Sequence, residues 1–82
     1  MKGNLEIVKF LVKLGANVET ENNYRRRPLS IAAMNGRLDV VKYFVEECYA
    51  YVNARDKNEY AAIHNARKLG QFDVVEYLKS LN

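Results

Sequence analysis

One segment occurs three times in this 82-residue chain, and its period constrains the fold more than any other feature. The three copies are residues 3–12 (GNLEIVKFLV), residues 36–45 (GRLDVVKYFV) and residues 70–79 (GQFDVVEYLK). Their leading glycines, Gly3, Gly36 and Gly70, set a period of 33 and then 34 residues. Repetition at this period indicates a stacked array of small units, because one such unit cannot bury its apolar face alone. Arrays of this kind usually work as binding surfaces.

The composition fits one small intracellular domain. The lone Cys48 cannot form an internal disulfide, and no cysteine and histidine cluster has the spacing of a zinc site. A single cysteine is typical of a reducing compartment, so we expect an intracellular, cytoplasmic location. Charges at Glu6, Lys9 and Lys13 interrupt the apolar N-terminal stretch, which argues against a signal peptide. No apolar run is long enough to span a membrane, so we expect no membrane partner.

The spacing of apolar residues predicts helices and polar arms. Each repeated segment has apolar residues three and four positions apart, which indicates an amphipathic helix. A second, shorter helix is expected at residues 28–35 and again at 62–69, because proline or alanine opens these stretches and glycine follows them. Residues 17–27 and 53–61 are polar and predict an extended arm with a turn. Helices of this length need packing against neighbours to be stable.

The order of these pieces resembles the ankyrin repeat. Residues 27–33 (RPLSIAA) resemble the family's Thr-Pro-Leu-His-x-Ala-Ala, and residues 36–42 (GRLDVVK) are similar to its Gly-His-x-Glu-Val-Val-Lys. Residues 14–18 (LGANV) and 51–56 (YVNARD) echo Gly-Ala-Asp-Val-Asn-Ala-x-Asp. The resemblance implies an all-α solenoid of stacked helix–turn–helix units with β-hairpin-like arms. It covers nearly the whole chain, which forms a single domain of residues 1–82.

The three units differ from one another. We divide the chain into a partial repeat at residues 1–21 (a second helix and its arm), a complete repeat at 22–55 and a C-terminal capping repeat at 56–82. The complete repeat has one extra residue near Cys48-Tyr49-Ala50, which explains the longer period. Arg25 and Glu59 stand where the family's arm usually has glycine. These two residues must therefore tolerate positive φ or change the turn.

The two ends of the array also differ. Arg67 and Lys79 place charge where a further repeat would dock, which is typical of a terminal cap. At the other end, Ile7, Val8 and Leu11 lack the helix that would normally cover them. We expect either that the chain is the C-terminal end of a longer array or that two copies self-associate through the uncovered helix at residues 4–14.

The sequence offers little for catalysis and predicts a non-enzymatic protein without cofactor or metal. No phosphate-binding loop, nucleophile elbow or metal-spaced cluster is present. Asp39 and Asp73 lie one repeat apart on outer faces, so they do not form an acid/base pair. The resemblance implies that His64 bonds neighbouring backbone and steadies the arm.

Protein–protein recognition is therefore the expected function. In ankyrin arrays the arm tips and the inner face of the first helices commonly bind the partner, and carrying these positions over gives Asn23, Tyr24, Arg26, Met34, Asn35, Arg55, Lys57, Asn58, Tyr60, Lys68 and Leu69. This set has basic residues, two tyrosines and no acidic residue, so we expect a protein partner with an acidic surface.

Two alternatives remain open. The run Tyr24-Arg25-Arg26-Arg27 could bind nucleic acid or another polyanion, although a net charge of +3 and the lack of a continuous basic groove argue against nucleic acid. The chain could also be a purely structural end of a longer array.

Overall fold

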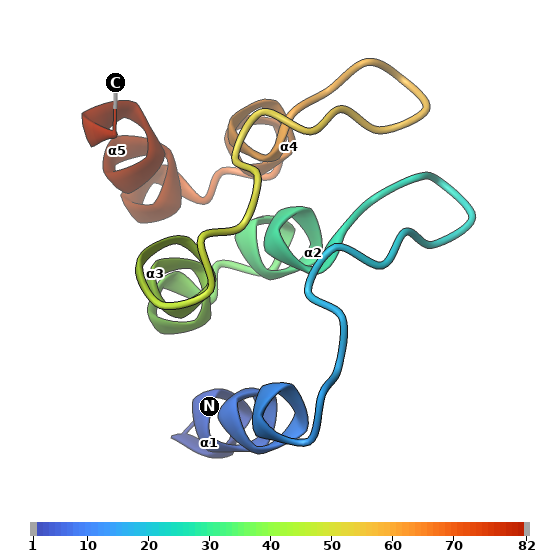
Figure 1. Ribbon diagram of the computed structural model, residues 1–82. Coiled ribbons are helices and arrows are strands. Elements are labelled where there is room, and N and C mark those ends of the chain that lie inside the picture. Colours follow the sequence, from blue (N-terminus) through green and yellow to red (C-terminus); the bar gives the residue numbers. More distant parts are fainter. Residues whose placement is uncertain (1, 82) are drawn as a thin grey trace.

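Five helices form two parallel layers, with the arms beyond one of them (Figure 1). The computed structural model describes residues 2–81, with side chains from Leu5 onward. Helices α1 (Lys2–Lys13), α3 (Leu38–Glu46) and α5 (Phe72–Ser80) make the outer layer. Helices α2 (Pro28–Met34) and α4 (Ala62–Lys68) make the inner layer, from which two arms extend. The described residues contain no strand, so the predicted all-α solenoid is confirmed.

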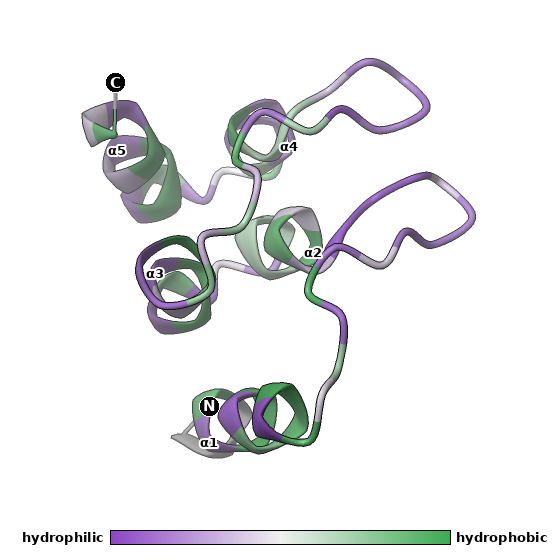
Figure 2. Cartoon of the chain, in the orientation of Figure 1, coloured by the Kyte–Doolittle hydropathy of each residue, from purple (hydrophilic) through white to green (hydrophobic). Residues whose placement is uncertain are grey.

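The helix bounds differ slightly from those expected. The first helix begins at Lys2 and ends at Lys13, so it is longer at its start than the predicted range of 4–14. Helices α2 and α4 each stop one residue before the predicted end, because their last residues, Asn35 and Leu69, already serve as C-caps. The arms are hairpin-like in path and are the most hydrophilic part of the chain (Figure 2).

Small residues and valines hold the layers together. Ala33, Val41, Ala66 and Val74 are completely buried. The alanines lie in α2 and α4, where a short side chain lets the two inner helices approach closely. The valines occupy the repeated segments of α3 and α5, so the sequence repeat places an apolar side chain of each unit in the core.

Gly36 and Gly70 end the inner helices in left-handed backbone, with φ of 70° and 76°. At Gly36 a second constraint applies, since a Cβ atom there would lie 2.5 Å from Oε1 of Gln71. The Gln71 side chain reaches back from the next repeat, and its Nε2 donates a hydrogen bond to the Met34 carbonyl at 3.0 Å. Glycine at position 36 therefore permits the left-handed turn and also leaves room for the Gln71 side chain of the next repeat.

Lysines stack on tyrosines across the outer layer. Lys9 Nζ lies 5.8 Å from the ring centre of Tyr43, and Lys42 Nζ lies 5.5 Å from that of Tyr77, one repeat further on. The Tyr77 hydroxyl donates a 2.6 Å hydrogen bond to Glu46. Burial first, and then this bond to a carboxylate, raise the pKa of Tyr77 to about 12.

Of the two outcomes that the sequence allows for the unusual arm residues, positive φ or a changed turn, the structure shows positive φ. Arg25 has a φ of 60° and Glu59 a φ of 66°, so both accept the left-handed conformation in place of glycine. The extra residue of the second unit is accommodated in the same way, since Tyr49 has a φ of 55° and is 84% exposed.

Replacing one strained residue by glycine should stabilise the protein. For Glu59→Gly we expect the free energy of unfolding to rise by about 0.5–1 kcal/mol, because relief of left-handed strain exceeds the added entropy of the unfolded chain. The control Glu76→Gly, in the exposed interior of α5, should lower it by about 1 kcal/mol. Urea unfolding followed by circular dichroism measures both, and a loss of stability in Glu59→Gly would contradict the strain argument.

Candidate functional site

Each arm turns around one side chain that accepts two backbone hydrogen bonds. In the first arm Asn22 Oδ1 accepts from the N–H groups of Tyr24 (2.9 Å) and Arg26 (3.0 Å). In the second arm Asp56 Oδ1 accepts in the same way from Asn58 (2.8 Å) and Tyr60 (3.0 Å). Such bonds from a short polar side chain to nearby backbone favour a turn over a strand. They explain why these segments form arms.

Asp56 also joins the two arms and the inner layer. Its Oδ2 accepts from Arg26 Nε of the first arm at 3.2 Å and from Asn65 Nδ2 of α4 at 3.1 Å. The backbone N–H of Lys57 donates to the Tyr24 carbonyl at 2.9 Å, which adds a second link between the arms. The side chain of Asp56 is almost fully buried. One carboxylate thus receives four hydrogen bonds from three elements.

These bonds determine the ionisation of Asp56. Burial alone would raise its pKa, but the backbone bond from Tyr60, the side-chain bond from Asn65, and the bonds from Asn58 and Arg26 outweigh burial and hold the pKa of the carboxyl below its ordinary 3.8. Asp56 is therefore charged at neutral pH and forms an internal ion pair.

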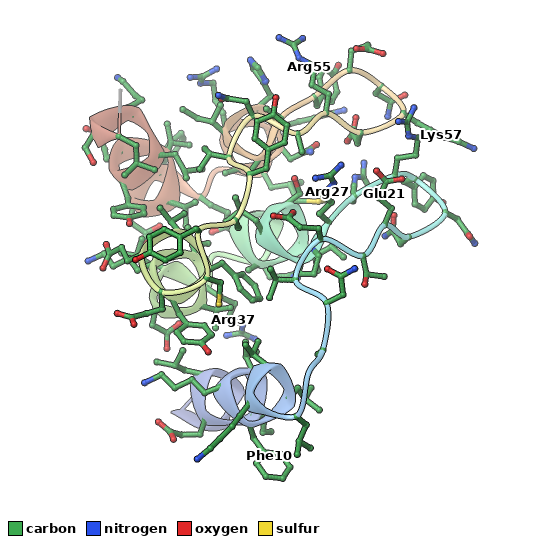
Figure 3. The ribbon with its side chains drawn as sticks, viewed as in Figure 1. Phe10, Glu21, Arg27, Arg37, Arg55 and Lys57 are labelled. Atoms are coloured by element: carbon green, nitrogen blue, oxygen red, sulfur yellow. The ribbon has the colours of Figure 1, made fainter. Side chains whose placement is uncertain are left out.

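The other two arginines of the first arm are also paired within the chain. Arg25 Nε lies 3.7 Å from Glu21, and Arg27 lies 3.3 Å from both Glu19 and Glu21. Figure 3 shows Arg27 and Glu21 close together at the base of this arm. Glu19 in addition accepts the backbone N–H of Tyr51 at 2.9 Å, which ties the first arm to the start of the second. The arginine run therefore holds the arms in place.

The predicted partner-binding residues fall into three groups. Most of them are exposed on the arms and at the ends of the inner helices: Asn23, Tyr24, Asn35, Arg55, Lys57, Asn58, Lys68 and Leu69. Met34 and Tyr60 are half-buried. Arg26 is half-buried as well and is engaged by Asp56, so the structure gives it a role in joining the arms. Whether these residues touch a partner stays a prediction.

Arg55, Lys57 and Lys68 form no ion pair with the described residues, unlike the arginines of the first arm. Lys68 Nζ stacks on the Tyr60 ring at 5.2 Å, and the Arg55 guanidinium donates to the Glu59 carbonyl at 3.4 Å. Figure 3 shows Arg55 and Lys57 reaching out from the second arm. We call these three residues with Tyr60 the basic arm patch. Its positive charge is available to a ligand.

His64 has the structural role that the resemblance implies. The Ala61 N–H donates a 3.2 Å hydrogen bond to His64 Nδ1, which fixes the imidazole against the start of α4. Within the part of the chain that the structure describes, no three histidine, cysteine or acidic side chains gather as a metal site would need. In the same residues no helix combines the length and apolarity required to cross a bilayer.

The chain belongs to the ankyrin repeat family. A family model of ankyrin repeats in three copies matches residues 1–82, which agrees with the stacked helix pairs and arms described above. The match extends through the first unit, even though that unit contributes a single helix.

Several curated proteins are similar to this chain in sequence over most of its length. Alpha-latroinsectotoxin-Lt1a of Latrodectus tredecimguttatus is 34% identical over 98% of this chain, which spans 6% of that protein. NF-kappa-B inhibitor zeta of Homo sapiens is 32% identical over 94% of the chain, which spans 12% of it. Notch-regulated ankyrin repeat-containing protein A of Danio rerio is 42% identical over 65% of the chain, which spans 47% of it. The chain thus covers less than half of each of these relatives.

Sequence reasoning missed the residues that join the arms, namely Glu19, Asp56 and Asn65. One signal was present, because Asn22 and Asp56 occupy equivalent positions in the repeat and both are short acceptors suited to a turn. Arg26 and Asn65, the partners of Asp56 in the first arm and in α4, lie in no local sequence pattern that would indicate contact with Asp56.

Removing the charge of Asp56 should weaken the whole domain. We expect Asp56→Asn to lower the free energy of unfolding at pH 7 by about 2 kcal/mol, because Arg26 and Asn65 lose a charged acceptor. Asn22→Ala, which removes the equivalent turn acceptor from an exposed arm, should cost about 1 kcal/mol or less. Urea unfolding compares the two, and equal losses would contradict the joining role of Asp56.

The difference between wild type and Asp56→Asn should depend on pH. Because the folded pKa of Asp56 lies below 3.8, its charge stabilises the fold fully above that pH. As pH falls below 3.8 and through the lower folded pKa, this contribution is lost and the two proteins should converge in stability. Thermal unfolding between about pH 7 and about pH 2.5 measures the difference, and a constant gap would show that Asp56 does not contribute through its charge.

Proposed function

We propose that the chain is a non-catalytic protein–protein interaction module that binds an acidic partner through its arm tips and the exposed side of α2 and α4. Ankyrin repeats generally mediate contacts between proteins. One relative is named as an inhibitor of NF-kappa-B, which is itself consistent with binding another protein. The cytoplasmic location and the absence of enzymatic activity belong to the same proposal.

The basic arm patch is the observation that carries this proposal. Lys68 stacks on Tyr60, and Arg55 and Lys57 extend from the same arm. None of the three basic residues has an acidic partner among the described residues, so an acidic ligand would gain new ion pairs without breaking old ones. Tyr24 of the first arm is exposed nearby and adds apolar contact area. Tyrosine and arginine are the residues most often found at interface hot spots.

The ion pairs of the first-arm arginines weigh against the polyanion alternative. A nucleic acid that gripped the run from Tyr24 to Arg27 would have to displace Glu19, Glu21 and Asp56 from the arginines, at distances of 3.2–3.7 Å. The basic arm patch that remains has three basic residues, fewer than the continuous basic face or stripe that is typical of a nucleic-acid interface.

Charge reversal on the basic arm patch tests the proposal. A fluorescent twelve-residue peptide rich in aspartate, glutamate and leucine serves as the acidic probe, and a DNA duplex of similar charge serves as the polyanion. We expect the double variant Lys57→Glu/Lys68→Glu to weaken peptide binding about tenfold or more, because two attractive contacts become repulsive. Fluorescence anisotropy at about 150 mM salt measures the affinity of the protein for each probe.

The matched control is Lys13→Glu/Lys79→Glu, which changes the net charge equally at exposed sites on α1 and α5. Equal weakening by both double variants would mean that only net charge matters and would contradict the patch. Tighter binding of the duplex than of the peptide, with a steep salt dependence, would favour the polyanion alternative. No binding of either probe would favour a purely structural role.

A further inference from the structure

Tyr49 is 84% exposed, more than any other large apolar residue that the structure describes. It lies between α3 and the second arm, in the middle of the array, so helices of the units before and after it are both present. Ala50, directly after it, is buried and anchors the segment in the core. Figure 1 shows this segment, drawn in yellow, well away from the tips of both arms. The exposure of Tyr49 is therefore a property of this segment and not of either end of the array.

The backbone at Tyr49 would suit glycine better than tyrosine. The N–H groups of Ala16 and Ala50 close the ends of α1 and α3 through equivalent 3.0 Å bonds to helix carbonyls. Tyr49 precedes Ala50 as Gly15 precedes Ala16, and both have positive φ, 55° and 100° respectively. Glycine adopts this conformation freely, whereas a residue with a side chain does so at a cost. A strained residue whose side chain is not packed in the core points to a role outside the fold.

The ring of Tyr49 also differs from every other tyrosine ring in the chain. Five of the six tyrosines have a lysine or arginine over the ring. Arg27, for example, covers Tyr51, two residues after Tyr49. Among the described side chains, no cation covers Tyr49, so its face is free to attract one from outside. The covered rings are those of Tyr24, Tyr43, Tyr51, Tyr60 and Tyr77, at distances of 5.0–5.9 Å from cation to ring centre.

The C-terminal end of α3 places negative charge next to this ring. Glu46 and the C-cap Glu47 end the helix, whose last turn contains no basic residue, whereas the last turns of α1 and α5 contain Lys13 and Lys79. The carbonyl end of a helix is itself negative, so it favours a cation and disfavours glutamate. Glu47, two residues before Tyr49, is exposed and forms no ion pair with the described residues.

We propose that Tyr49 and Glu47 bind an arginine from a basic segment of a partner protein. The guanidinium stacks on the Tyr49 ring, as Arg27 stacks on Tyr51, and donates to the Glu47 carboxylate beside the carbonyl end of α3. The ring, the carboxylate and the helix end all attract the same charge, which selects a basic partner over a merely apolar one. This surface is opposite in charge to the basic arm patch and does not rest on the proposed function.

An arginine-bearing peptide tests the proposal. A fluorescent ten-residue peptide of alternating arginine and serine is the probe, and anisotropy at about 50 mM salt measures its affinity for the 82-residue protein. We expect Tyr49→Phe to bind like wild type, and Tyr49→Leu and Glu47→Gln each to weaken binding about threefold. Tyr49→Gly should weaken binding to a similar degree while Tm rises by about 4 °C, because the strain is relieved. A loss of binding in a more stable protein separates the site from folding.

Two control variants match these changes. Phe72 is 67% exposed and begins α5 beside Asp73, so it combines an open ring with a carboxylate at the opposite, positive end of a helix. Glu6 is an exposed glutamate on α1. We expect Phe72→Leu and Glu6→Gln to keep wild-type affinity for the arginine peptide.

Several results would overturn the proposal. Failure of the peptide to bind, or wild-type affinity in Tyr49→Leu, would remove the site, and equal weakening by the controls would reduce binding to general charge. Self-association of the protein that Tyr49→Leu abolishes, measured by sedimentation, would make a second copy the occupant in place of a partner. The acidic probe of the basic arm patch should bind Tyr49→Leu and wild type equally, so the two surfaces are tested separately.

Discussion

The inner helices have seven residues each, and helices of that length do not persist alone in water. Every other feature follows from this constraint, because each unit is stable only where a neighbouring unit covers it. Ala33 and Ala66 let α2 and α4 approach, and Val41 and Val74 fill the space behind them. Gln71 closes the end of α2 from the next repeat. The stability of the domain therefore resides in contacts between units more than within them.

The sequence predicts local elements well because the signals that specify them are local. Apolar spacing, the glycines after the short helices and the repeat period were enough to place all five helices, within one or two residues. The positive φ at Arg25 and Glu59 was one of two outcomes that the sequence allowed, the other being a changed turn, since both residues replace glycine. The links through Asp56 could not, because Arg26 lies 30 residues away in sequence and meets Asp56 only after the units stack. For the same reason the sequence could not indicate that Arg26 joins the two arms.

Charge on the arms has two uses that composition cannot separate. The arginines of the first arm face Glu19, Glu21 and Asp56, so their charge acts inside the molecule to fix its geometry. The second arm has two basic residues, Arg55 and Lys57, and leaves them without such partners among the described residues. A count of arginine and lysine cannot separate these uses, whereas the structure shows that the arginines of the first arm are paired with carboxylates of the chain and that Arg55 and Lys57 form no ion pair with the described residues.

The residue added at Tyr49 separates the path of the chain from the stacking of its units. Its left-handed backbone takes up the extra length between α3 and the second arm, while Lys42 still reaches Tyr77 and Arg26 still reaches Asp56. Side-chain contacts therefore align neighbouring repeats, and the segment between α3 and the second arm only has to be long enough to connect them. This junction can therefore take up an added residue without disturbing the alignment of the units.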